Sequence, residues 1–235
     1  FDWSRYLDNR MTFAIDPVVH SPYFSNSQFV AQKAKDAIAD RFRERTSLRP
    51  SVNREDPDLA INVHIAGSRV SVSLDSSGAS LHKRGYRLGH FEAPLNEVLA
   101  AGMIRMTGWK GERHFLDPMC GSGTLAIEAA MIASGIPPGF YRKQYGFERW
   151  KDFDRDMLEH VARSLPAEKE LNVPIIARDI SSEAVALTRR QLKKLELDHL
   201  VKCEVLDFEA SPAMEGVLIV VNPPYGERIL TDDID

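Results

Sequence analysis

The sequence predicts a parallel α/β fold of the Rossmann type over its second part, with a smaller α+β domain in front. Three observations predict it. From about residue 113, short apolar segments alternate with helical segments, which is the order of a doubly wound sheet. Residues 117–124 form a glycine-rich turn between an apolar segment and a helical one. Before residue 78, a helical segment is followed by two alternating strands, the pattern of an α+β unit.

The composition is that of a globular protein with one or two domains. The chain has 235 residues, of which 43% are hydrophobic and 27% charged. No stretch is as long and apolar as a membrane span, so we expect no membrane partner. Cys120 and Cys203 lack Cys-x-x-Cys spacing, and the histidines are not clustered. These features predict a reducing, cytoplasmic location and no metal.

Charge does not identify a partner by itself. Residues 1–89 carry 13 Lys and Arg against 10 Asp and Glu, and the remainder carries 17 against 24. The front part is therefore mildly basic, although the whole chain has a net charge of −4. Such a small excess could touch phosphates, but chance explains it about equally well.

The front region, residues 1–78, is expected to hold a helix and a hairpin. The helix begins near Asn26 or Ser27, either of which can cap it, and runs to about Arg45. Two alternating strands follow, over residues 61–65 and 70–74, joined by residues 66–69. The helix presents one apolar face made by Phe29, Val30, Ala34, Ala37, Ile38 and Phe42.

The second region, residues 79–235, is expected to hold four parallel strands at 113–117, 173–179, 201–207 and 217–222. Helices are predicted over 123–135 and 182–196. An insertion over 136–172, with a short helix near 154–165, separates the first two strands. Its aromatic and basic residues suit stacking on unpaired bases, or equally a loop packed on the flank of a domain. They are Phe140, Tyr141, Arg142, Lys143, Tyr145, Phe147, Arg149 and Trp150.

The glycine-rich turn predicts a ligand site. Asp117 ends an apolar strand, and Gly121 and Gly123 lead directly into a helix, so the backbone can approach a ligand at the helix N-terminus. The turn has neither the Gly-x-Gly-x-x-Gly of dinucleotide enzymes nor a phosphate loop with Gly-Lys-Ser/Thr, which argues against NAD and ATP. Asp179 and Asp207 close the next two strands, and Asp179 is at the position that binds ribose hydroxyls in doubly wound folds.

Asn222-Pro223-Pro224-Tyr225 stands where the last apolar run stops. Two prolines cannot continue a strand, so the peptide leaves the sheet with an amide side chain, free carbonyls and an aromatic ring. This set suits accepting hydrogen bonds from an exocyclic amine while the ring stacks on its heterocycle. A turn that merely ends a strand is the alternative interpretation.

Three groups of residues together resemble the THUMP-containing RNA methyltransferases. Within them the sequence is similar to the RlmL-type enzymes, which methylate the N2 amine of a guanine in bacterial 23S rRNA. The likeness covers nearly the whole chain, including residues 26–28 and 35–38. It is carried by residues 81–87, residues 117–128 and residues 222–228.

The resemblance implies an S-adenosylmethionine-dependent enzyme that acts on rRNA. It implies catalytic roles for Asn222, Pro223, Pro224 and Tyr225. His82, Lys83, Arg84 and Arg87 would lie near the mouth of the active site and could contact RNA. Cofactor contacts are implied for Asp117, Pro118, Met119, Cys120, Gly121, Ser122, Gly123, Thr124, Asp179 and Asp207.

The family comparison also implies that both predicted domains are incomplete. The front region corresponds to the later part of a THUMP domain, which is a ferredoxin-like RNA-docking module. The methyltransferase fold of the family has seven strands, and only four are predicted here. We therefore expect residues 1–78 to be an N-terminally incomplete THUMP region and residues 79–235 a C-terminally incomplete methyltransferase domain.

Two other functions stay open from the sequence. An N6-adenine DNA methyltransferase would use the same corner at residues 222–225, although the helix and hairpin in front argue against it. A noncatalytic RNA-binding module is the other alternative, and the presence of both cofactor and amine motifs argues against it. The modified nucleotide and the oligomeric state are left open.

Overall fold

The computed structural model describes residues 1–88, 94–165 and 174–224. The chain forms two compact units, residues 1–80 with 143–165 and residues 81–142 with 166–235. The insertion over residues 136–172, which was expected within the second domain, thus contributes residues 143–165 to the first unit. A domain boundary between residues 78 and 79 remains our proposal.

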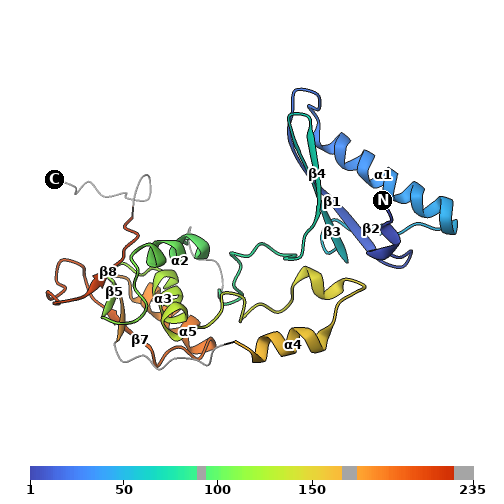
Figure 1. Cartoon of the computed structure of the whole chain (residues 1–235). Helices are drawn as coiled ribbons and strands as arrows, with labels where there is room; N and C mark the ends of the chain where they lie inside the picture. Colours follow the sequence, from blue (N-terminus) through green and yellow to red (C-terminus); the bar gives the residue numbers. More distant parts are fainter. Residues whose placement is uncertain (89–93, 166–173, 225–235) are drawn as a thin grey trace. The chain divides into compact units, whose positions relative to one another are not determined.

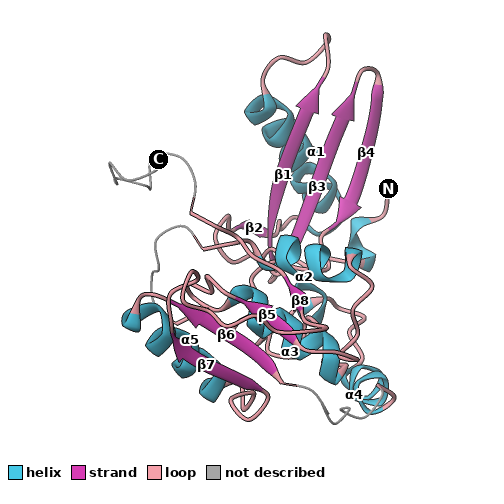
Figure 2. Cartoon of the chain, turned by 90° about the vertical axis from the view of Figure 1, so that its left-hand side faces the viewer, coloured by secondary structure: helices cyan, strands magenta, loops and turns pink. Residues whose placement is uncertain are grey.

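The first unit is a four-stranded sheet in the order β2-β1-β3-β4 (Figures 1 and 2). Its strands are β1 (Thr12–His20), β2 (Ser51–Val52), β3 (Leu59–Ala66) and β4 (Arg69–Leu74). β1 runs parallel to β2 and β3, and β4 pairs antiparallel with β3. Helix α1 (Ser27–Thr46) packs against β1, and a short 3₁₀ turn, η1 (Trp3–Arg5), precedes the sheet.

The predicted helix and hairpin of this unit are confirmed. Asn26 caps α1, because its side-chain oxygen accepts a hydrogen bond from the backbone N–H of Phe29 at 3.1 Å. The hairpin turn is shorter than predicted: Ala66 pairs with Arg69, which leaves two residues in the turn. Gly67 has φ of +60° there, as tight hairpin turns require.

Residues 143–165 complete the first unit. They carry the 3₁₀ turn η2 (Gly146–Arg149) and helix α4 (Arg155–Arg163). Trp150 packs against the core that surrounds Phe13 and Ile61. Arg149 lies 2.6 Å from a carboxylate oxygen of Asp56. This part of the insertion is therefore packed, which favours the second of the two interpretations of its aromatic residues.

The second unit is a parallel sheet in the order β7-β6-β5-β8. The strands are β5 (Phe115–Asp117), β6 (Ile175–Asp179), β7 (Val201–Val205) and β8 (Leu218–Ile219), all within the predicted ranges. Helices α3 (Thr124–Ser134) and α5 (Ser182–Lys194) follow β5 and β6 as predicted, and α2 (Glu97–Met106), which was not predicted, packs against α3. Most of α3 is buried, so it forms the centre of the core.

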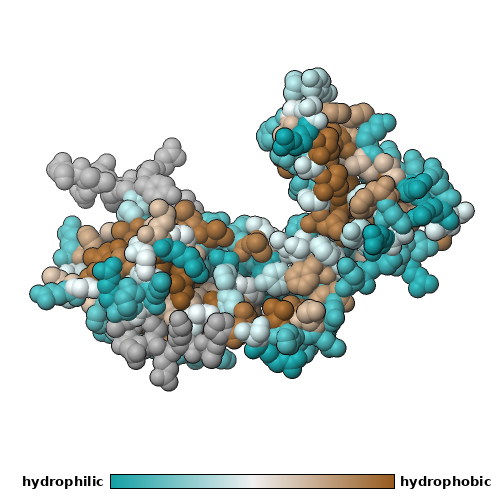
Figure 3. Space-filling view, viewed as in Figure 1, coloured by the Kyte–Doolittle hydropathy of each residue, from teal (hydrophilic) through white to brown (hydrophobic). Residues whose placement is uncertain are grey.

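Apolar side chains also reach the surface. On the first unit they gather along the sheet (Figure 3), where Val70 and Val72 of β4 are 54% and 56% exposed. Both valines pair with residues of β3 that face the core, so they lie on the core side of the sheet at its edge. Among the helices in the described ranges, none is both long and apolar enough for a membrane span.

Candidate active site

A cavity of about 390 Å³ lies at the carboxyl ends of the parallel strands in the second unit. This is where doubly wound folds bind their ligands. Its lining comes from the glycine turn, from the loops after β6, β7 and β8, and from the segment before α2. The lining residues are Pro94, Leu95, Asp117, Pro118, Met119, Cys120, Gly121, Ser122, Thr124, Leu125, Asp179, Ile180, Ser181, Ala184, Asp207, Phe208, Asn222, Pro223 and Pro224.

The glycine turn is held against the end of β6. The backbone N–H of Gly121 donates to Oδ2 of Asp179 at 2.8 Å, and the N–H of Cys120 donates to the carbonyl of Arg178 at 2.7 Å. Gly121 adopts φ of +52°, a region that favours glycine. Oδ1 of Asp179 accepts from the N–H of Ser181 at 2.9 Å, so this carboxylate orders both loops that meet at the cavity.

Gly123 is the one described member of the predicted cofactor set that does not line the cavity. Its φ is +79°, and a Cβ atom added there would lie 2.5 Å from Cγ2 of Thr188. The residue therefore permits close packing of the turn against α5.

Two side chains of α5 hold the glycine turn through hydrogen bonds to its carbonyl groups. The hydroxyl of Thr188 donates to the carbonyl of Gly121 at 3.0 Å, and Nε2 of Gln191 donates to the carbonyl of Ser122 at 2.6 Å. Both side chains are fully buried. Turn carbonyls satisfied in this way hold the turn in one conformation. Neither residue was predicted.

Asp117 is a buried carboxyl group at the centre of the site. Burial raises the pKa of Asp117 to about 7; the backbone N–H of Met119, 3.4 Å from Oδ1, opposes the shift, and the charge of Asp179 adds to it. Burial likewise raises the pKa of the Cys120 thiol, which therefore stays protonated at neutral pH. A positively charged group of a ligand beside Asp117 would lower this pKa and favour the carboxylate form.

Asp207 and two apolar neighbours complete the far side of the cavity. β7 ends at Val205, so Asp207 lies two residues beyond the strand that it was predicted to close, and its side chain accepts from the N–H of Glu209 at 3.0 Å. Ile180 and Phe208 directly follow Asp179 and Asp207, line the cavity and are 71% and 50% exposed. Neither residue was predicted, although an apolar residue directly after each acidic one is a signal that the sequence contains.

The proline corner reaches the same cavity. The N–H of Val220 donates to the carbonyl of Leu116 at 3.1 Å, which continues the pairing of β8 with β5 as far as the corner. Asn222, Pro223 and Pro224 then line the cavity opposite the loop after β7. Tyr225, the remaining predicted member of the corner, lies outside the residues that the structure describes.

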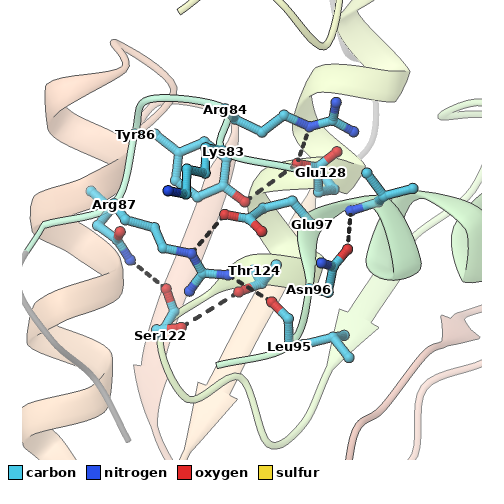
Figure 4. Close-up of polar contacts among 12 residues, drawn as sticks. Lys83, Arg84, Tyr86, Arg87, Leu95, Asn96, Glu97, Ser122, Thr124 and Glu128 are labelled. Atoms are coloured by element: carbon cyan, nitrogen blue, oxygen red, sulfur yellow. Dashed lines mark hydrogen bonds and ion pairs between the residues drawn. The ribbon is translucent and has the colours of Figure 1, made fainter. Parts of the chain in front are cut away.

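Two arginines of the basic motif form ion pairs within the second unit (Figure 4). Arg84 is buried, and its Nε lies 3.4 Å from Oε1 of Glu128, which also accepts from the hydroxyl of Tyr86 at 3.3 Å. Nε of Arg87 lies 2.6 Å from Oε1 of Glu97. Both guanidinium groups are engaged inside the unit, so an RNA contact by these two has no support in the structure. His82 and Lys83 remain proposals.

Over residues 1–88, 94–165 and 174–224, no group of three or more His, Cys, Asp or Glu residues could hold a metal ion. The polar side chains that line the cavity carry three carboxyl groups, one amide, three hydroxyls and one thiol, a donor set that suits an organic ligand.

Comparison with known proteins agrees with this geometry. The THUMP domain family matches residues 1–75. The ribosomal RNA large subunit methyltransferase K/L of Shewanella sp. strain ANA-3 is 44% identical over 237 residues, which is 97% of this chain and 33% of that protein. The chain therefore spans about a third of the length of the curated relatives that it matches.

Solved structures share the fold. SMU.472, described as a methyltransferase and crystallised with SAH, has a TM-score of 0.85 and 29% identity, covering 98% of this chain and 62% of its own. A Listeria monocytogenes protein described as a predicted N6-adenine-specific DNA methylase has a TM-score of 0.83 and 29% identity, over 97% and 60%. The predicted fold class is confirmed. Because the RMKL-like methyltransferase domain family matches residues 84–233, well over half of the sequence, the chain belongs to that family and carries a THUMP domain ahead of its methyltransferase domain.

Proposed function

We propose that this chain is the catalytic part of an S-adenosylmethionine-dependent enzyme that methylates the N2 amine of a guanine in bacterial 23S rRNA. One observation carries the proposal: the glycine turn, Asp179, Asp207 and the corner at Asn222 line a single cavity. A methyl donor and the acceptor amine must meet within bonding reach, so their binding residues must share one space. We also propose a cytoplasmic location, where this substrate is found.

The residues present fit S-adenosylmethionine. Asp179 would accept from the ribose hydroxyls, because each carboxylate oxygen that holds a loop N–H keeps a second lone pair. Ile180 and Phe208 offer apolar surface for adenine, and Asp207 can accept from its amino group. Asp117 suits the α-ammonium group at the amino-acid end of the ligand, because a nearby cation relieves its unfavourable ionisation. When bound, the cofactor supplies an electrophilic methyl group on a sulfonium.

The corner residues would prepare the acceptor. The lone pair of an exocyclic amine is delocalised into the base, which makes it a poor nucleophile. Hydrogen bonds from this amine to the Asn222 side-chain oxygen and the Pro223 carbonyl would favour a tetrahedral nitrogen and localise the lone pair toward the methyl group. Tyr225 would stack on the base. The proton can leave after transfer, because the methylated ammonium is acidic.

Two supports point to rRNA. The THUMP match supports an RNA-docking role for the first unit, and the curated relatives are named as large-subunit rRNA methyltransferases. The choice of guanine N2 rests on the resemblance of residues 81–87 and 222–228 to the RlmL-type enzymes.

An N6-adenine DNA methyltransferase is the second candidate. The description of the Listeria neighbour favours it, and the corner serves adenine and guanine amines alike. Mass spectrometry of nucleosides decides between them. A deletion strain should lose N2-methylguanosine from large-subunit rRNA and regain it with the intact gene but not with the Asn222→Ala gene. Unchanged rRNA together with loss of N6-methyladenine from DNA would establish the alternative.

A further inference from the structure

Arg87 holds one wall of the cavity in place. Its Nη2 donates to the carbonyl oxygen of Leu95 at 2.6 Å, and its Nε lies 2.6 Å from Oε1 of Glu97. Leu95 and Pro94 line the cavity, and Glu97 is the first residue of α2 (Figure 4). The Glu97 side chain is only 3% exposed. One planar cation therefore fixes both the wall and the start of the helix behind it.

The residue after Arg87 is tied to the glycine turn. The backbone N–H of Leu88 donates to Oε1 of Gln191 at 3.1 Å, while Nε2 of the same amide donates to the carbonyl of Ser122 at 2.6 Å. A buried amide with both ends engaged has a single orientation. A continuous path of polar contacts and backbone thus runs from the Leu95 wall through Arg87 and Gln191 to the turn.

We propose that Arg87 is a positioning residue that sets the distance between the Pro94–Leu95 wall and the glycine turn, and hence the fit of the cofactor. This rests on the proposed function for the identity of the ligand. Arginine suits the task, because its rigid fork serves a carboxylate and a carbonyl at once, whereas the compact ammonium of lysine lacks that geometry.

The chain supplies a matched control three residues earlier. Arg84 pairs with the buried Glu128, and its Nη1 donates to the carbonyl of Leu81 at 3.2 Å. It therefore has the same kind of partners as Arg87, a buried glutamate and a backbone carbonyl. Leu81 does not line the cavity. A general structural role would make the two arginines equivalent toward the ligand.

The test compares Arg87→Lys with Arg84→Lys, both of which leave a cation near the buried glutamate. Calorimetry with S-adenosylhomocysteine is carried out where circular dichroism shows each variant folded. Arg87→Lys should raise Kd roughly tenfold, equivalent to about 1.4 kcal/mol, and Arg84→Lys by less than about twofold. Equal effects of the two substitutions, or no effect of Arg87→Lys, would overturn the proposal.

A second readout does not depend on the ligand. Hydrogen–deuterium exchange of peptides covering residues 94–99 should be faster in Arg87→Lys than in both the parent chain and Arg84→Lys. Failure of the parent chain to bind S-adenosylhomocysteine would count against the proposed cofactor, and this exchange comparison would still decide the positioning role. Unchanged exchange in Arg87→Lys would then refute it.

Discussion

The raised pKa of Asp117 predicts how cofactor affinity depends on pH. If the α-ammonium group of the ligand binds Asp117 in its carboxylate form, Asp117 must first lose its proton. With a pKa of about 7, Asp117 is about nine-tenths protonated at pH 6 and about one-quarter protonated at pH 7.5. The Kd for S-adenosylhomocysteine should therefore be roughly eightfold larger at pH 6 than at pH 7.5.

The same shift affects stability with a definite sign. The folded pKa lies above the ordinary value of 3.8, so the folded chain holds this proton more tightly than the unfolded chain does. Asp117 therefore contributes most to the free energy of unfolding below about pH 4. This contribution, up to about 4 kcal/mol, is lost as the pH rises through 7. Asp117→Asn should stabilise the ligand-free protein at pH 7.5 and remove this part of the pH dependence.

Calorimetry at four pH values between 6 and 7.5 tests the reasoning, with thermal melts of both variants in the same buffers. The described residues that line the cavity include no histidine, so Asp117 is the group expected to titrate in this range. Asp117→Asn should bind weakly, with a Kd that changes little with pH. If the Kd of the parent protein is constant from pH 6 to 7.5, Asp117 does not bind the α-ammonium group of the ligand.

Four further single substitutions, one of them with a second-site partner, test the site and the packing behind it. Asp179→Ala should weaken S-adenosylmethionine binding by about 1–3 kcal/mol in calorimetry, the scale for losing hydrogen bonds to a charged acceptor, and an unchanged Kd would remove Asp179 from the site. Asn222→Ala should lower kcat with cofactor affinity nearly unchanged, whereas Tyr225→Ala should also raise KM for RNA; the reverse pattern would contradict these roles. Gly123→Ala should lower stability in chemical denaturation by about 2 kcal/mol, because its Cβ would meet Thr188 and its φ is +79°, and Thr188→Ser in the same chain should recover part of the loss.

Local patterns were enough to predict most of the second unit. Strand ends, glycines and capping residues are close in sequence to what they specify, so β5, β6, α3 and α5 fall at the expected places. β1 was missed because Pro17 argues against an inner strand. Its neighbour β2 pairs only with Thr12 and Phe13, so β1 has a free edge at Pro17 and tolerates it. α2 was missed because Val98 and Leu99 are half-exposed, which blurs the helical period.

The supporting contacts of the site were beyond prediction for a different reason. Gln191 meets Ser122 across 69 residues of sequence, and Arg84 meets Glu128 across 44. A buried arginine and an exposed one cannot be told apart in a sequence, and a cluster of cations within six residues more often forms a solvated surface. Only the fold shows that two of these cations pair with buried glutamates.

Residues 143–165 belong to the first unit although residues 81–142, which precede them, belong to the second, and this has a consequence for biosynthesis. Trp150 packs on a core built mainly from residues 7–65, and Arg149 pairs with Asp56. The first unit therefore lacks part of its packing until about residue 165 has been synthesised. At about 5–20 residues per second, the ribosome needs several seconds to cover the intervening stretch, which also supplies β5 and α3. Nascent chains arrested before residue 150 should therefore show a front unit more sensitive to protease than chains arrested well after residue 165. For the same reason, a deletion of residues 1–75 would remove the core residues against which Trp150 packs.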